Sequence, residues 1–177
     1  MFLAFLGLSS GAIKAASLNG SWKTLCKPQK KQSEIQKISF DGTNLKYEIT
    51  QFEDLNCLIP LKNTVWMMKH EVFRENPSSS FWKINLSLQG IYLRGLSSEL
   101  IKTFNNEANC DFTAWKVGEF KEVSGIKCAN QEYKAKGFKA YNVLSQQENK
   151  LTFSISSSSP SVIQRPKRPA KTVFYSL

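Results

Sequence analysis

Apolar and polar residues alternate with a period of two along most of the chain, in short runs that turn residues separate. Because successive side chains of a strand point to opposite faces, this pattern predicts antiparallel strands with one buried face. Asp41-Gly42 predicts a hairpin turn between two runs, and Gly90 either separates two strands or bends one long strand. The predicted strands are 18–26, 36–40, 44–52, 62–73, 81–88, 90–96, 112–117, 120–128, 137–144 and 151–156.

One segment, residues 98–106, follows the period of a helix instead. Ser97 or Ser98 precedes it and can accept a hydrogen bond from the free backbone N–H groups of its first turn. Its apolar face comprises Leu100, Ile101 and Phe104. The sequence therefore predicts one short helix among the strands.

The last residues of the chain, 172–177, are apolar enough to need a partner. We expect them to return as a final strand that helps to close the sheet. The preceding residues, 156–169, are rich in Ser and Pro and predict a loop. The predicted fold class is all-β, an antiparallel up-and-down barrel of about eight to ten strands with one short helix.

The first residues resemble a secretory signal. An apolar run is followed by the small residues Ala15 and Ala16, which suit cleavage, and the run of about ten apolar residues is shorter than the roughly 20 that span a bilayer. We predict a signal peptide over 1–15, a single domain over 16–177, and export to the periplasm or the extracellular space. The alternative is a buried first strand or helix of the mature fold.

The chain has four cysteines, and all of them follow the predicted signal peptide. An even number of cysteines in an exported protein predicts disulfides. Three pairings are possible; we favour Cys26 with Cys57 and Cys110 with Cys128, because each bond then staples one local unit. A zinc site is disfavoured, since no Cys-x-x-Cys pair occurs and the single histidine, His70, is far in sequence from all four cysteines.

The formal net charge of +10 becomes +9 when Lys14 leaves with the predicted signal peptide. The basic residues are spread along the chain, which is typical of a solvated surface. Such a charge attracts anionic envelope surfaces over long range. No nucleic-acid-binding motif accompanies it, and we expect a monomer that does not bind nucleic acid.

Residues that could catalyse a reaction do not form a recognisable pattern. His70 has no Cys or Ser nucleophile motif beside it, and Glu53 and Asp54 are adjacent, so on a strand they point to opposite faces. Neither a phosphate-binding glycine loop nor a metal-ligand cluster is present in the sequence. We therefore predict no enzymatic activity and no cofactor.

Several short motifs occur together along the mature chain. They are Gly20-Ser21-Trp22 with Cys26 shortly after it, Phe40-Asp41-Gly42, Asp54-x-x-Cys57, Gly125-x-x-Cys128, and an Arg-Pro pair followed by Tyr175. In these motifs the chain resembles small secreted lipocalin-like proteins of bacteria. The resemblance implies that Trp22 closes one end of a lipocalin-like barrel and that Arg165 or Arg168 stacks on its ring in a cation-π contact.

The strand over 62–73 is the best candidate for the wall of a ligand site. One of its faces carries Thr64, Trp66, Met68, His70 and Val72, without a carboxylate or a lysine, so we expect it to point inward. Aromatic rings, a polarizable Met and a few polar tips are typical of small-molecule pockets. The predicted ligand-binding residues are Tyr47, Trp66, Met68, His70 and Trp82.

The function expected from the sequence is that of an exported binding protein, which holds a small apolar or amphipathic ligand inside the barrel. The same residues would also make an ordinary filled core. The alternative is therefore an envelope interaction protein or a barrel-type protease inhibitor, whose barrel is solid and whose loops act.

Overall fold

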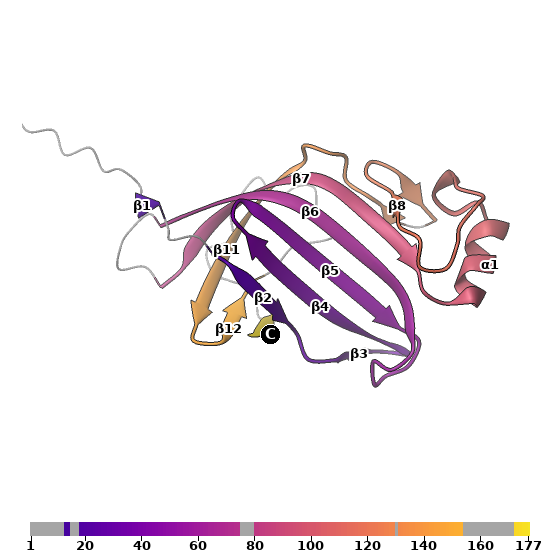
Figure 1. The fold of residues 1–177 in the computed structure, drawn as a ribbon, viewed down its shortest axis with the longest axis horizontal. Coiled ribbons are helices and arrows are strands. Elements are labelled where there is room, and N and C mark those ends of the chain that lie inside the picture. Colours follow the sequence, from indigo (N-terminus) through magenta and orange to yellow (C-terminus); the bar gives the residue numbers. More distant parts are fainter. Residues whose placement is uncertain (1–12, 15–17, 75–79, 130, 154–171) are drawn as a thin grey trace, which may run out of the picture.

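Eight strands of the chain form a closed antiparallel barrel (Figure 1). The computed structural model describes residues 13–14, 18–74, 80–129, 131–153 and 172–177. The barrel strands are β2 (Gly20–Lys23), β4 (Gln32–Asp41), β5 (Asn44–Phe52), β6 (Pro60–Arg74), β7 (Trp82–Gly95), β11 (Lys139–Gln147), β12 (Lys150–Thr152) and β13 (Val173–Ser176). Each pairs with the next one along the chain, and β13 pairs with β2 to close the ring. The predicted up-and-down barrel, closed by a strand at the end of the chain, is confirmed.

Among the described residues, five short strands lie outside this ring. They are β1 (Ile13–Lys14), β3 (Lys27–Gln29), β8 (Lys121–Glu122), β9 (Lys127–Cys128) and β10 (Gln131–Glu132). β1 pairs with β6, β3 with β4 and β8 with β7, while β9 and β10 pair only with each other. Apart from the two residues of β1, the predicted signal peptide lies outside the described residues. The whole of the predicted Ser/Pro loop, 156–169, also lies outside them, including Arg165 and Arg168.

The hairpin between β4 and β5 turns where the sequence predicts it. Asp41 pairs with Asn44, and Gly42 adopts a positive φ of 55°, which glycine tolerates without strain. β5 has the predicted bounds, but β4 begins at Gln32 rather than at residue 36, because its first residues pair with β3.

The long strand β7 bends at a bulge near Gly90. Gly90 pairs with Met67 of β6 and Leu88 with Met68, so Gln89 has no opposite residue in β6. Before the bulge β7 pairs with β11, and beyond it β7 pairs with β8. The bulge therefore lets the chain leave the ring at this end, where α1 and β8 lie (Figure 1).

The helix α1 (Ser98–Asn106) has the predicted bounds, and the Ser97 side chain accepts a hydrogen bond from the Leu100 N–H. Ile101 and Phe104 are its buried residues. A Cβ atom on Gly95, the last residue of β7, would lie only 2.7 Å from Cδ1 of Ile101. The helix thus packs directly on the end of β7, and we call this the helix end of the barrel.

The strands predicted over 112–117 and 120–128 are wrong. This part of the chain contains a short 3₁₀ turn, η1 (Asn109–Asp111), then irregular chain and the two-residue strands β8 and β9. The Asn105 side chain accepts a hydrogen bond from the Trp115 N–H at 2.7 Å and donates one to its carbonyl at 3.1 Å. Trp115 therefore needs no sheet partner, and its ring packs 5.0 Å from that of Phe104.

Large aromatic rings fill the opposite end of the barrel, which we call the packed end. Trp22 is 4% exposed and meets Phe40 edge-on at 5.9 Å, and Phe40 meets Phe153 at 6.4 Å. Phe153 and Phe174 are almost completely buried. Trp22 is thus a buried core residue at the packed end, whereas its predicted arginine partners are not described.

Gly20 should be intolerant of substitution, because it lies directly beneath the Trp22 ring. Its φ is +136°, and a Cβ atom there would lie 2.9 Å from Cη2 of Trp22. Gly20→Ala should lower the free energy of unfolding by about 2 to 3 kcal/mol, measured by urea denaturation. Gly118→Ala is the control: its φ is +78° but nothing lies within 4 Å, so backbone strain alone should cost about 1 kcal/mol. Equal losses in the two variants would contradict the close approach.

Candidate functional site

An apolar hollow lies inside the barrel between its middle and the helix end. Its volume is about 60 Å³. The barrel wall contributes Trp66, Met68, Leu86, Leu88, Ile91 and Ala140, and residues that precede β11 contribute Gln131, Glu132, Tyr133, Lys134 and Phe138. The packed end is filled by rings, whereas this part of the interior is not, so the two halves of the barrel differ.

The chain between the bulge of β7 and β11 covers the hollow. We call residues 121–129 and 131–138 the covering segment. Gly137 and Phe138 hydrogen-bond through their backbones to Leu88, at 2.8 and 2.9 Å, and the Tyr133 phenol hydrogen-bonds to the side chain of Thr64 on β6. Leu88 and Thr64 lie on the paired strands β7 and β6, so the covering segment lies over this part of the barrel wall.

A disulfide ties the covering segment down. Cys128 at the end of β9 is bonded to Cys110 in η1, just after α1, which confirms one of the two favoured pairings. The backbone N–H of Val123 also donates to the Ile91 carbonyl of β7, beyond the bulge, at 2.8 Å. The covering segment is therefore held to the helix end by a covalent bond as well as by hydrogen bonds.

A second, more polar cleft of about 300 Å³ adjoins the hollow at the helix end. It is lined by Lys62, Leu93, Phe104, Asn109, Cys128, Ala129, Gln131 and Tyr133. Gln131 and Tyr133 line both spaces, so the cleft and the hollow are neighbours.

Tyr47 and Glu34 lie next to this interior. The Tyr47 ring lies 5.4 Å from the ring of Trp66. Burial, reinforced by the nearby Glu34 carboxylate, raises the pKa of the Tyr47 phenol, which stays neutral. Glu34 is itself buried and accepts a hydrogen bond of 2.6 Å from the Gln36 side chain. The wall beside Trp66 thus carries one neutral hydroxyl and one carboxylate with an amide partner.

The predicted ligand-binding residues divide into two groups. Trp66 and Met68 line the hollow, and Tyr47 packs against Trp66. His70 and Trp82 do not line it. The His70 ring packs edge-on against Phe40, at 5.1 Å, at the packed end, where burial lowers the pKa of its imidazole. The guanidinium of Arg74 lies 4.4 Å over the Trp82 ring.

Sequence reasoning missed Lys62 and the covering segment. The expected inner face of β6 contains a lysine after all, because Lys62 has the same alternation as Thr64 and Trp66. Counting back along the predicted strand would have found it. The sequence contains a weaker indication of Tyr133 and Phe138. The predicted disulfide of Cys128 showed only that this part of the chain is bonded to another part.

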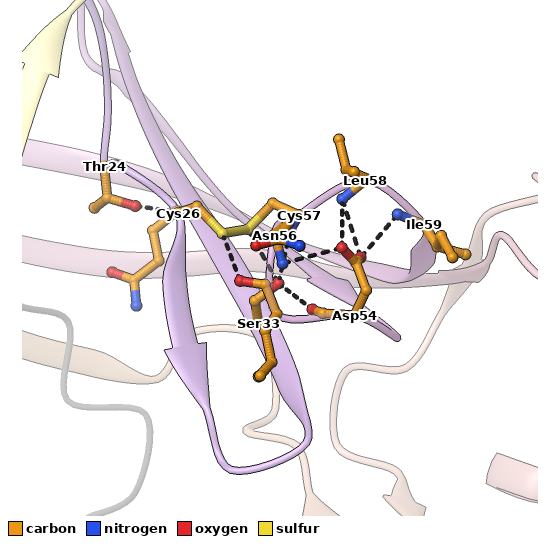
Figure 2. Close-up of a disulfide and its surroundings, with 10 residues drawn as sticks. Thr24, Cys26, Ser33, Asp54, Asn56, Cys57, Leu58 and Ile59 are labelled. Carbon is orange, nitrogen blue, oxygen red and sulfur yellow. Dashed lines mark hydrogen bonds between the residues drawn. A yellow bond between two sulfur atoms is a disulfide. The ribbon is translucent and has the colours of Figure 1, made fainter.

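The second disulfide, Cys26–Cys57, confirms the other favoured pairing and holds the loop between β5 and β6 (Figure 2). The Asp54 carboxylate accepts hydrogen bonds from the backbone N–H groups of Asn56, Leu58 and Ile59, which lower the pKa of that carboxyl. Leu58 and Ile59 are nevertheless 75% and 53% exposed. The loop is therefore well ordered by its bonds but presents apolar side chains to solvent.

A comparison of the chain with models of known protein families finds no match, and none of the curated proteins matches it either. The lipocalin-like resemblance remains a prediction. Two disulfides indicate an oxidising compartment outside the cytoplasm. The described residues contain no helix that is long and apolar enough to cross a membrane.

Proposed function

We propose that this protein binds a small apolar or amphipathic molecule in the hollow of its barrel. The observation that carries the proposal is the contrast between the two ends. Phe153 and Phe174 are almost completely buried at the packed end, whereas the apolar wall around Trp66 and Met68 leaves space beside the covering segment. Apolar walls with a few polar groups are typical of small-molecule sites.

The size of the hollow limits what it can hold without a change of shape. Small-molecule pockets typically hold about 300 to 1,000 Å³, so a hollow of about 60 Å³ accommodates only a small group. A longer ligand must displace Tyr133 and Phe138, which belong to the covering segment. We therefore propose that the covering segment moves outward as the ligand enters and that the Cys110–Cys128 bond limits this movement.

We also propose that the protein is exported, as the apolar N-terminal segment predicts. The oxidising compartment that the two disulfides indicate supports this proposal. The same compartment would expose the protein to amphipathic molecules of the envelope.

One observation favours the alternative of an envelope interaction protein. Leu25, Leu55, Leu58 and Ile59 are exposed beside the Cys26–Cys57 disulfide, and exposed apolar clusters often mark contact surfaces. In that case the loops would bind the partner, and the hollow would be only a packing defect in the core. Binding of an apolar dye inside the barrel distinguishes the two functions.

Ala140→Phe tests the proposed function, because the new ring should occupy the hollow. The wild-type protein should bind the neutral dye N-phenyl-1-naphthylamine saturably at one site, measured by dye fluorescence. Ala140 lines the hollow from β11, so the variant should bind at least about tenfold more weakly. Circular dichroism establishes whether the variant is folded.

The matched control is Tyr141→Phe, at the next position of the same strand and on its opposite face. This variant should bind the dye as the wild type does. The proposed function is wrong if the folded wild type shows no saturable binding, or if Ala140→Phe and Tyr141→Phe bind equally well.

A further inference from the structure

Lys62 extends from the inner face of β6 into the cleft at the helix end. It pairs with Gln51 of β5 on one side and with Gly95 of β7 on the other. It shares this face with Thr64, whose side chain bonds Tyr133, and both Lys62 and Tyr133 line the cleft. A cation is thus placed at the inner wall of the barrel, not on its outer surface.

The Lys62 ammonium group has no anionic partner among the described residues: none of their carboxylates lies within ion-pair distance of it. Burial lowers its pKa, and no neighbouring carboxylate counteracts this effect. A partly buried cation without a counter-ion is costly to maintain. This cost would be offset if an anion entered the cleft.

Glu34 is the carboxylate that could compete for this role. It faces the same interior, because Lys62 pairs with Gln51 and Gln51 pairs with Glu34. Its side chain is held by Gln36, however. Burial lowers the pKa of Lys27 and the Glu34 charge partly counteracts this effect, whereas burial alone lowers the pKa of Lys62. Glu34 therefore leaves the Lys62 ammonium available.

The cleft also offers neutral hydrogen-bond donors. Asn109, Gln131 and Tyr133 line it together with Lys62, and Gln131 and Tyr133 continue into the apolar hollow. A molecule with a charged head in the cleft could therefore extend an apolar tail toward Trp66. The cleft is the more polar space and would suit the charged head, whereas the apolar hollow would suit the tail.

We propose that Lys62 binds the anionic head group of a single-chain amphiphile whose tail occupies the hollow beside Trp66. This inference rests on the proposed function and specifies the class of ligand. The recognised chemistry is that of a carboxylate or a phosphate monoester on an alkyl chain. Charge-assisted hydrogen bonds from an ammonium group to such oxygens are stronger than those between neutral groups.

The test compares amphiphiles of equal chain length as competitors of N-phenyl-1-naphthylamine. Decanoate and decyl phosphate are the anionic arms, and decanol is the neutral arm. Lys62→Met should weaken the better anion by about tenfold or more and leave decanol within about twofold. Whichever anion loses more affinity identifies the head group.

Lys69→Met is the matched control, because it removes the same charge from the exposed outer face of the same strand. It should leave all three competitors unchanged. Lys62→Arg keeps the charge and should retain anion binding within about threefold, which separates loss of the cation from a general disturbance of the wall.

The outcomes separate this inference from the proposed function. If the dye binds but Lys62→Met weakens decanol as much as both anions, or weakens none of them, Lys62 does not select an anion and the inference fails alone. If neither the dye nor any amphiphile binds to the folded wild type, the proposed function fails as well.

Discussion

Trp22→Ala should lower the free energy of unfolding by about 3 to 5 kcal/mol. The indole is 4% exposed, and its removal would leave a cavity between Phe40 and the Gly20 backbone. The ring's N–H has no hydrogen-bond partner among the described residues, so the loss should come from packing rather than from a broken hydrogen bond. Urea denaturation followed by far-UV circular dichroism measures the change.

Trp82→Ala is the control for this prediction. It removes the same side chain from a position that is only partly buried, under the guanidinium of Arg74. It should cost less than about 2 kcal/mol. If the two variants lose equal stability, Trp22 does not hold the packed end together.

Removal of the Cys110–Cys128 bond should have the second large effect. With a sequence separation of 18, the bond should stabilise the fold by roughly 3 kcal/mol through the entropy of the unfolded chain. The double variant Cys110→Ser/Cys128→Ser should lose about that much. It should also bind N-phenyl-1-naphthylamine several-fold more weakly, because the covering segment is no longer held over the hollow.

The other disulfide provides the comparison. Cys26→Ser/Cys57→Ser opens a link of sequence separation 31 and should lose a similar amount, roughly 4 kcal/mol. This bond holds the loop between β5 and β6 (Figure 2), and neither of its cysteines belongs to the covering segment. Dye binding per folded molecule should therefore persist. Equal loss of binding in both double variants would show that the covering segment has no special role.

Local sequence signals predicted the barrel well. Asp41-Gly42 specifies a turn that depends on neighbouring residues only, and β5 follows from strict alternation. The helix α1 follows from Ser97 and the spacing of its apolar face. Each of these signals lies within a few residues, so that distant parts of the chain do not alter it.

The region around Trp115 could not be predicted in the same way. Its aromatic and β-branched residues are types that favour a strand, but the backbone of Trp115 bonds to the Asn105 side chain, and its ring packs on Phe104. These contacts come from α1, an element earlier in the chain. Whether the backbone of Trp115 bonds to a neighbouring strand or to a side chain depends on the tertiary structure. The alternation of residues in the sequence does not reveal this.

Alternation identified a face of β6 but not the part of it that is hollow. Trp66, Met68 and His70 share that face, yet only the first two line the hollow. Where space remains depends on the rings that other strands place inside, such as Phe153, and on the bulge in β7. As a result, His70 does not line the hollow, whereas residues of the covering segment do.

Native mass spectrometry of the disulfide-bonded protein, purified gently from its own host, is the decisive test of ligand binding in the hollow. We expect a complex of one chain with one small molecule, which Ala140→Phe lacks and which dissociates to the mass of the chain with two disulfides. A spectrum that shows only the unliganded chain, both as purified and after incubation with decanoate and decanol, would contradict it.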